Sequence, residues 1–537
     1  MLVWTSIVVS SCGCCSSFLL LWILRKYIQW LCSPLKKIPG PPSPSFLLGH
    51  FPTIFREPFL DPQLRWWKEI GYDQPLMHYT HILGKSNLLV LDKELVREIL
   101  TAPAGKKVCR FEKCLDLLKT ITGNGLVTLQ GEDWMRHRQI VQPAFNTGFI
   151  RDALSTSVPP RVKTLIECWA KAEGREIDLN SQLSALTLDI IGDVAFGHNF
   201  RALERVQRWA EGADQDDREA QMAVDDPFAK AMERAFKVDL FSVSLLSIGL
   251  PWLNSYINPT TIKRRWYLNQ ATQEIVRNAR QKVIETSQTN KGRSLLQLLL
   301  LANENDGCAT DSVKFKVLTD IEIREEAKTF ILAGHETTST WCYWSIYALA
   351  KYPDLQEKVY REIVGHKDSK TADLLTLEAA EEMPYFNAFL SEVLRMYPPV
   401  GFITRRNPNE EMLGGYKIPP RTRLIISSFL LHRNPKYWSE PDMFSPERWI
   451  HKDDAEREEF NNKIRFAYIP FSAGGRNCIG HLFATYEAKI ILSNLIREFS
   501  FVIAPSQRET MHTLTSFVSM KAKPGLKICA KRRSALT

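Results

Sequence analysis

One cysteine near the C-terminus has neighbours that suit metal ligation. Cys478 lies in the glycine-bearing segment Phe471–Gly480, directly before a helical run that ends at Phe499. Exposed N–H groups and the dipole at a helix N-terminus favour a thiolate. The glycines let the backbone approach a flat group closely, Arg476 can reach an anionic substituent of that group, and Phe471 can shield the sulfur from water. The segment therefore predicts haem held by one thiolate, against the alternative of an ordinary buried cysteine.

The same segment resembles the F-x-x-G-x-R-x-C-x-G signature of the cytochrome P-450 haem-thiolate monooxygenases at every fixed position. The resemblance covers about residues 39–530, because further motifs of that family follow in the expected order. It implies the cytochrome P-450 fold, haem b with Cys478 as the axial iron ligand, and O2 as co-substrate. It is specific for the family and says little about the substrate.

A second motif, Ala333-Gly-His-Glu-Thr-Thr338, lies inside a long helical run at 321–351. A glycine in a helix interior costs about 1 kcal/mol, so its presence needs a reason. The resemblance implies that Ala333 and Gly334 widen the helix where O2 binds. It also implies an acid–alcohol pair, in which Thr337 donates a hydrogen bond at the O2 site and Glu336 relays protons. Taken alone, the pair would be a solvated glutamate and a threonine bonded to its own helix.

Charged residues elsewhere match supporting motifs of the family. Glu392 and Arg395, three residues apart, share one helical face. With Arg448 of the segment Pro446–Trp449, the resemblance implies a buried brace for the loop that presents Cys478, without a part in the chemistry. Trp449 stands where the family usually has phenylalanine.

Two further elements suit the carboxylates of haem. Trp134 and Arg138 match the W-x-x-x-R element, which implies contact with a haem propionate. Arg405 follows Tyr397 by eight residues and stands where a second propionate partner is expected, although the adjacent Arg406 could serve instead. Arginines facing two carboxylates are electrostatically sensible.

The elements that must position these residues are mostly helical. Helical spacing is found at 161–173, 181–196, 264–287, 321–351, 355–364, 385–396 and 483–499, and short strands are indicated at 88–91, 415–418 and 424–428. No internal repeat or linker divides the chain after residue 45. We predict a mainly α fold with a small β part, forming a single large haem domain at 46–537.

The N-terminal segment has the character of a membrane anchor. Residues 1–24 carry no charge and Arg25 and Lys26 follow, so the run can span a bilayer of about 30 Å with the rest of the chain in the cytoplasm. We predict an anchor and basic juxtamembrane segment at 1–38 and a proline-rich hinge at 39–45. A cleaved signal peptide and a lipoprotein signal remain alternatives, although both lack the usual basic start. Lipidation of the N-terminal cysteines is left open.

Composition narrows the class of protein and of partner. The 537 residues are 45% hydrophobic and 24% charged, which excludes a disordered chain and a protein with many membrane spans. A diffuse net charge of +9 favours an acidic protein or anionic lipid over nucleic acid. After residue 32 the cysteines are scattered without a CxxC pair, which indicates a reducing compartment. The basic cluster Lys527, Lys531, Arg532 and Arg533 is interpreted as a solvated end.

Together with the N-terminal anchor, the resemblance implies an endoplasmic reticulum membrane enzyme that inserts one atom of O2 into a lipophilic substrate. Electrons would come from an NADPH reductase or from cytochrome b5, because the chain has no flavin or nucleotide motif. A peroxide-consuming isomerase or dehydratase and a non-catalytic haem carrier or sensor remain alternatives. Substrate-contacting stretches are expected at 106–127, 228–252, 400–404 and 514–518. The apolar part 240–252 would either dip into the membrane surface or belong to the core.

Overall fold

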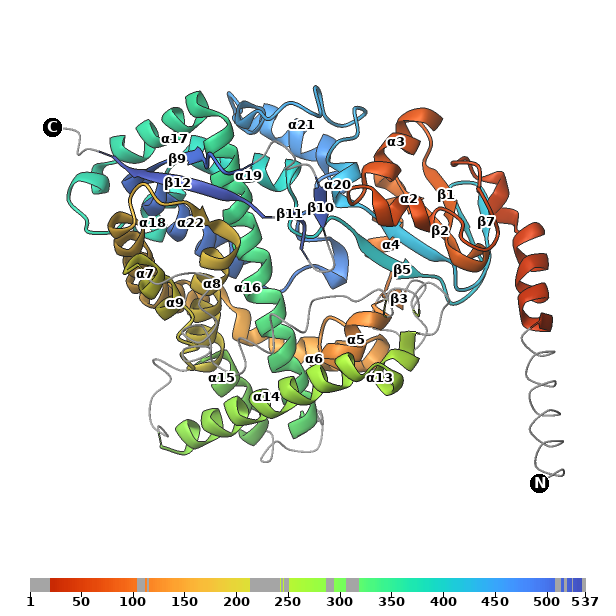
Figure 1. The fold of residues 1–537 in the computed structure, drawn as a ribbon, viewed down its shortest axis with the longest axis horizontal. Helices are drawn as coiled ribbons and strands as arrows, with labels where there is room; N and C mark the ends of the chain where they lie inside the picture. Colours follow the sequence, from red (N-terminus) through yellow and green to blue (C-terminus); the bar gives the residue numbers. More distant parts are fainter. Residues whose placement is uncertain are drawn as a thin grey trace.

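The fold is mainly helical with small sheets, as predicted (Figure 1). The structure is a computed structural model that describes residues 20–103, 112–113, 115–212, 242, 245, 251–285, 294–305, 318–507, 513–515, 519–523 and 525–533. The helices are α2 Phe51–Arg56, α3 Asp61–Ile70, α4 Lys93–Thr101, α5 Asp116–Thr122, α6 Gly131–Val141, α7 Thr147–Lys171, α8 Leu179–Phe196, α9 Leu203–Ala210, α13 Asn254–Ile257, α14 Pro259–Glu285, α15 Leu295–Asn305, α16 Asp320–Lys351, α17 Pro353–Gly365, α18 Leu377–Glu381, α19 Pro384–Met396, α20 Ser428–Leu431, α21 Asp454–Ile464 and α22 His481–Glu498. Short 3₁₀ turns include η4 Pro251–Leu253, η7 Pro446–Trp449 and η8 Gly474–Arg476.

In the part of the chain that the structure describes, the strands form four small sheets. They are β1 Leu76–Thr80, β2 Ser86–Val90, β3 Glu112–Lys113, β4 Ile177–Asp178, β5 Ile403–Arg406, β6 Glu411–Leu413, β7 Tyr416–Ile418, β8 Arg423–Ile426, β9 Phe499–Ile503, β10 Thr513–Thr515, β11 Lys521–Lys523 and β12 Lys527–Arg532. The largest has the order β1-β2-β8-β5-β3, in which β2 and β8 run parallel; β4-β12-β9, β6-β7 and β10-β11 form the others. Only the three strands indicated by the sequence near 88, 415 and 424 were predicted.

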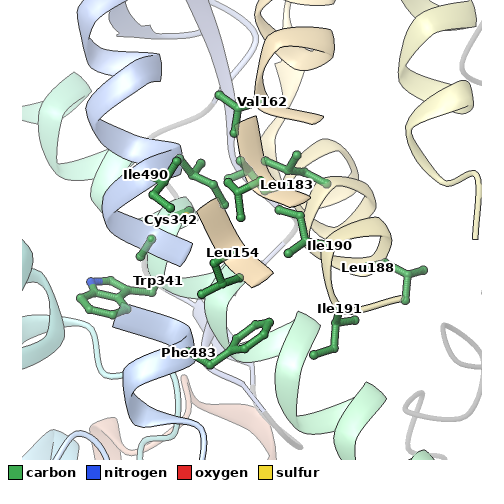
Figure 2. Close-up of a cluster of buried hydrophobic side chains, with 14 of the residues drawn as sticks. Leu154, Val162, Leu183, Leu188, Ile190, Ile191, Trp341, Cys342, Phe483 and Ile490 are labelled. Carbon is green, nitrogen blue, oxygen red and sulfur yellow. The ribbon is translucent and has the colours of Figure 1, made fainter. Parts of the chain in front are cut away.

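Helix α16 crosses the body between the helical part and the five-stranded sheet (Figure 1). Thr319 and Glu322 form a capping box at its N-terminus, which satisfies N–H groups that would otherwise lack partners. Most of its 32 residues are buried. Figure 2 shows Trp341 and Cys342 of this helix within the main core, among side chains of α7, α8 and α22. Packing on several sides therefore fixes the position of α16, and with it the positions of the site residues that the helix carries.

Helix α7 is longer than its spacing indicated. The sequence predicts a helix from Arg161, after the pair Pro159–Pro160, but the structure begins it at Thr147. Proline in a helix interior removes a hydrogen bond and usually kinks or ends the helix. Here Leu154 and Val158 before the prolines and Val162 after them are all fully buried, so apolar packing maintains one helix across the pair.

The basic C-terminal cluster is largely solvated, as predicted: Lys527, Lys531 and Arg532 are exposed, and Arg533 is half-buried. Lys527 and Arg532 are the terminal residues of β12, the central strand of its sheet. Arg533 pairs with Glu357, with Nη1 3.1 Å from Oε2, and its guanidinium lies 3.6 Å from the ring centroid of Tyr360. The strand places this cation where a carboxylate and an aromatic face meet.

The first half of the predicted anchor segment 1–38 lies outside the described residues, which begin at residue 20. Residues 20–31 are helical, and their exposed side chains include Leu20, Leu21, Leu24 and Ile28. Within the described ranges, no helix is both long enough and apolar enough to cross a bilayer.

Gly334 allows α16 and α8 to approach closely. A Cβ atom there would lie 2.8 Å from Cδ1 of Ile191, so Gly334→Ala should lower the free energy of unfolding by about 1–3 kcal/mol, despite a better helix propensity. Gly365→Ala is the control, because a Cβ there meets no atom within 4 Å. Denaturant titration of both variants checks this, and adding Ile191→Ala to Gly334→Ala should cost less than the sum of the single changes. Equal stability of the two glycine variants would contradict the packing argument.

Candidate active site

The loop that carries Cys478 is tightly constrained. The backbone N–H of Cys478 donates to the carbonyl of Phe471 at 2.9 Å. Gly474 has φ +70°, and a Cβ there would lie 2.0 Å from the carbonyl oxygen of Leu100, so only glycine fits. Helix α22 begins three residues after Cys478, with Gly480 as its N-cap, two residues before the helical run 483–499 that the sequence predicts. The constrained backbone holds Cys478, whose side chain is exposed.

Helix α6 packs against this loop through the predicted Trp134 and Arg138. Arg476 donates from Nη1 to the carbonyl of Leu129 at 2.9 Å, and its guanidinium lies 3.8 Å from the ring centroid of Trp134. Arg138 donates from Nη1 to the carbonyl of Asn477 at 3.3 Å and from Nη2 to the Oδ1 atom of Asn477 at 3.2 Å. Burial lowers the pKa of Arg138, while the nearby Cys478 thiol acts in the opposite direction. Two arginines therefore flank the cysteine.

Phe471 lies beside the loop rather than in the deep core. Its ring is half-buried and is 6.1 Å from the ring of Trp341 on α16 and 6.3 Å from that of His481. The aromatic ring therefore connects the cysteine loop to α16. Shielding of the sulfur by Phe471 stays a prediction.

Arg405 is a buried cation on β5. Its side chain is 4% exposed, and its Nη1 atom donates to the carbonyl of Thr404 at 3.0 Å. Burial lowers its pKa to about 10. In the part of the chain that the structure describes, no carboxylate forms an ion pair with it. Arg406, the alternative, is half-buried and points to the opposite face, because successive strand residues alternate.

These residues fit a haem group. Burying a charge without a counter-ion is costly, so Arg405 requires an anionic group that the described residues do not provide. A haem propionate would meet that need, and the exposed Cys478 thiol would provide the axial ligand. Arg138, Arg476 and the Trp134 N–H group would hold the second carboxylate.

The predicted O2-site residues share the less buried side of α16. Ala333 is exposed and Gly334 and Thr337 are half-buried, while most of the helix around them is buried. The Thr337 hydroxyl donates to the Ala333 carbonyl at 2.6 Å. The structure also gives Gly334 a packing reason, its contact with Ile191.

The side chain of Glu336 interacts with the C-terminal hairpin β10–β11, whereas the hydroxyl of Thr337 bonds to its own helix. The Oε1 atom of Glu336 lies 2.8 Å from Nζ of Lys521 and accepts a hydrogen bond from the Ser519 hydroxyl at 2.7 Å. Burial raises the pKa of Glu336, but the charges of Lys521 and His335 and the hydrogen bonds outweigh it and lower the pKa to about 2. Glu336 is therefore a carboxylate at neutral pH. Neither Ser519 nor Lys521 was identified from the sequence.

A buried ion cluster stands behind the cysteine loop. Glu392 and Arg395 are fully buried and form two hydrogen bonds, from Nε to Oε2 at 2.9 Å and from Nη2 to Oε1 at 2.8 Å. Arg448 donates from Nε to Oε1 at 3.1 Å, and the indole N–H of Trp449 donates to Oε2 at 2.9 Å. All three residues expected in the brace meet. The tryptophan adds a hydrogen bond that phenylalanine could not make.

Comparison with known proteins decides the family. The family model described as Cytochrome P-450 matches residues 39–530. The chain belongs to the cytochrome P-450 family. It is 30% identical to cytochrome P-450 4Z1 of Homo sapiens over 78% of this chain and 77% of that protein. It is 26% identical to cytochrome P-450 4A14 of Rattus norvegicus (89% and 87%) and 27% identical to Protein LUTEIN DEFICIENT 5, chloroplastic, of Arabidopsis thaliana (84% and 71%).

Membership of the cytochrome P-450 family makes this protein an oxidoreductase, a haem-thiolate monooxygenase that uses O2. Its signature cysteine is Cys478. Members of the family generally act on lipophilic substrates with the help of redox partners.

His432 is a supporting residue of this cytochrome P-450 that the sequence did not reveal. It is fully buried, and burial together with the charge of Arg395 lowers its pKa to about 3, so the imidazole is neutral. Its Nε2 atom accepts from the backbone N–H of Ile469 at 2.9 Å, and its Nδ1 atom donates to the carbonyl of Arg395 at 3.2 Å. Ile469 lies two residues before Phe471, so His432 connects the ion cluster to the cysteine loop.

The predicted substrate-contacting stretches are only partly described. Most of 228–252, residues 106–111 and 114 of the first stretch, and residues 516–518 of the last lie outside the described residues. Phe402 and Ile403 of the stretch 400–404 are half-buried, and Phe402 lies 5.5 Å from the ring of Phe59. Their contact with substrate stays a prediction.

Trp449→Phe tests the additional hydrogen bond in the brace. Removing the indole donor leaves an oxygen of the buried Glu392 with one partner fewer, so the free energy of unfolding should fall by about 1–3 kcal/mol. Trp266→Phe is the matched control, because Trp266 is 56% exposed and should change stability by no more than about 0.5 kcal/mol. Denaturation of both variants measures the difference. Equal effects would mean that the Trp449 hydrogen bond does not strengthen the brace.

Proposed function

We propose that this protein is a membrane-anchored monooxygenase that inserts one oxygen atom of O2 into a lipophilic substrate and receives its electrons from an external NADPH reductase or cytochrome b5. Its parts are an anchor at 1–38, a hinge at 39–45 and a cytoplasmic haem domain at 46–537, at the endoplasmic reticulum membrane. The single observation that carries the proposal is the exposed Cys478 thiol on a constrained loop flanked by arginines, with Arg405 buried without an ion-pair partner among the described residues.

Haem bound at this site would supply the activation of O2. Cys478 would ligate the iron, and Arg405, Arg476, Arg138 and Trp134 would hold the propionates. Their fixed positions would orient the group without reorganisation, because each is already held by the surrounding protein. Phe471 would keep water from the sulfur.

Glu336 and Thr337 would handle protons. The Thr337 hydroxyl lies on the less buried side of α16 and can exchange its bond to the Ala333 carbonyl for one to a ligand. Glu336, held as a carboxylate, can take up a proton from water and pass it on. This pair favours a monooxygenase over the peroxide-consuming isomerase or dehydratase, which would need no such delivery.

Exposed aromatic side chains support contact with a membrane. Trp252 of η4, Tyr256 of α13 and Trp266 and Tyr267 of α14 are 45–72% exposed. Tryptophan and tyrosine favour the interface between lipid and water. Figure 1 shows α13 towards the same side of the body as the exposed apolar residues 20–31. Both would face the lipid when the chain is anchored.

A spin-state titration of the purified ferric protein tests the function and the substrate class together. Fatty acids, sterols, carotenoids and drug-like amines are added separately, and we expect one class to produce a saturable low-to-high-spin shift. That compound should then be oxygenated only with NADPH, reductase and O2. Turnover with peroxide alone and no shift would favour the isomerase, and binding without any turnover would favour a carrier or sensor.

A further inference from the structure

A lysine of the C-terminal hairpin β10–β11 is the partner of Glu336. Lys521 is 15% exposed and Glu336 is 23% exposed, so the ion pair is largely shielded from water. Ser519, two residues earlier, donates its hydroxyl to the same carboxylate oxygen. Two side chains of one segment therefore hold the acid of the acid–alcohol pair.

The backbone between these two residues is clamped. The carbonyl of Met520 accepts from the indole N–H of Trp344 on α16 at 2.7 Å, and its N–H donates to the carbonyl of Pro399 at 2.8 Å. A Cβ on Gly401 would lie 2.1 Å from the Met520 sulfur. The segment is thus attached to α16 on one side and to the chain after α19 on the other, so Lys521 has a defined position.

The charges near Glu336 leave Lys521 as its dominant partner. His335 has Nε2 3.8 Å from Glu336 Oε2, but burial lowers the pKa of His335 and its Nδ1 atom contacts the Ile331 carbonyl at 2.8 Å. His335 therefore carries less positive charge at neutral pH than a histidine in water would. Within the described ranges, Lys521 is the one lysine or arginine within ion-pair distance of Glu336.

We propose that Lys521 is a positioning residue for proton delivery: together with Ser519 it holds the Glu336 carboxylate against the C-terminal hairpin. This inference rests on the proposed function, in which Glu336 carries protons. Each turnover consumes two protons from the solvent, and each time Glu336 accepts a proton from hydronium it passes that proton on, so the carboxylate is restored. Because the hairpin also contains Leu514 of a predicted substrate-contacting stretch, substrate that presses on the hairpin would act on the same lysine.

Infrared titration of the carboxyl groups tests this without turnover. Burial, which raises the pKa of Glu336, is already its largest single influence, and Lys521→Met removes the largest opposing one, so the pKa of Glu336 should rise above the ordinary value. A protonated-carboxyl band should then appear at mildly acidic pH, remain absent in the wild type and vanish in Lys521→Met/Glu336→Gln. Lys521→Arg should restore the wild-type spectrum. Lys527→Met, which removes a lysine 52% exposed on the next strand, is the control.

Turnover provides the second readout. In Lys521→Met, the fraction of NADPH electrons recovered in product should fall about tenfold, which is less than the roughly 10²–10⁴-fold that general acid–base catalysis contributes, because Glu336 itself is retained. The acidic limb of the pH profile should move to higher pH in Lys521→Met, because the pKa of Glu336 rises. Lys521→Arg should restore both the recovery of electrons in product and the wild-type pH profile. If the Lys521→Met variant does not fold, Lys521→Gln is used in its place, because it also removes the positive charge.

The outcomes separate the two proposals. If the carboxyl spectrum and the pH profile of Lys521→Met match those of the wild type, the role of Lys521 is overturned while the monooxygenase assignment stands. If Glu336→Gln itself turns over normally, the proton-carrying role of Glu336 in the proposed function fails.

Discussion

The rest of the site depends on the buried ion pair between Glu392 and Arg395. Both side chains are fully buried, and breaking such a pair by removing one partner typically costs about 3–5 kcal/mol, because an uncompensated charge remains. The pair survives burial because Arg448, Trp449 and surrounding carbonyl groups satisfy its remaining donors and acceptors. Through His432 this cluster reaches the backbone two residues before Phe471. A structural ion cluster thereby determines where a chemically active thiol lies.

Two nearby residues of helix α16 have different structural roles, one in close packing and the other in holding a charge. At Gly334 the helix must let α8 approach, and the absence of a side chain allows this. At Glu336, two residues on, it must hold a charge, and the C-terminal hairpin provides the counter-ion. Thr337 and Ala333 keep the exposure that a ligand requires. Packing, charge and access are separated around one helix, because neighbouring residues on a helix point in different directions.

The residues of the site that lie in local sequence motifs could be predicted, whereas the long-range contacts that complete the site could not. The cysteine loop, the Glu392–Arg395 spacing and the helical periods were readable because each lies within a few residues of sequence. Lys521 was not, because 185 residues separate it from Glu336 and no local pattern pairs them. The same holds for Ile191 against Gly334. The sequence shows Trp449 in the place of phenylalanine but not the hydrogen bond from its N–H group to Glu392. It predicts α7 only from Arg161, because the packing before the prolines is not a local signal.

The central claim is that Cys478 presents a thiolate to haem iron, and the absorption of the reduced, CO-treated holoprotein tests it most directly. We expect the far-red Soret band typical of sulfur ligation in the wild type. We also expect that Cys478→Ala abolishes this band while the protein remains folded. A band typical of histidine ligation in the wild type, or an unchanged band in Cys478→Ala, would contradict the account.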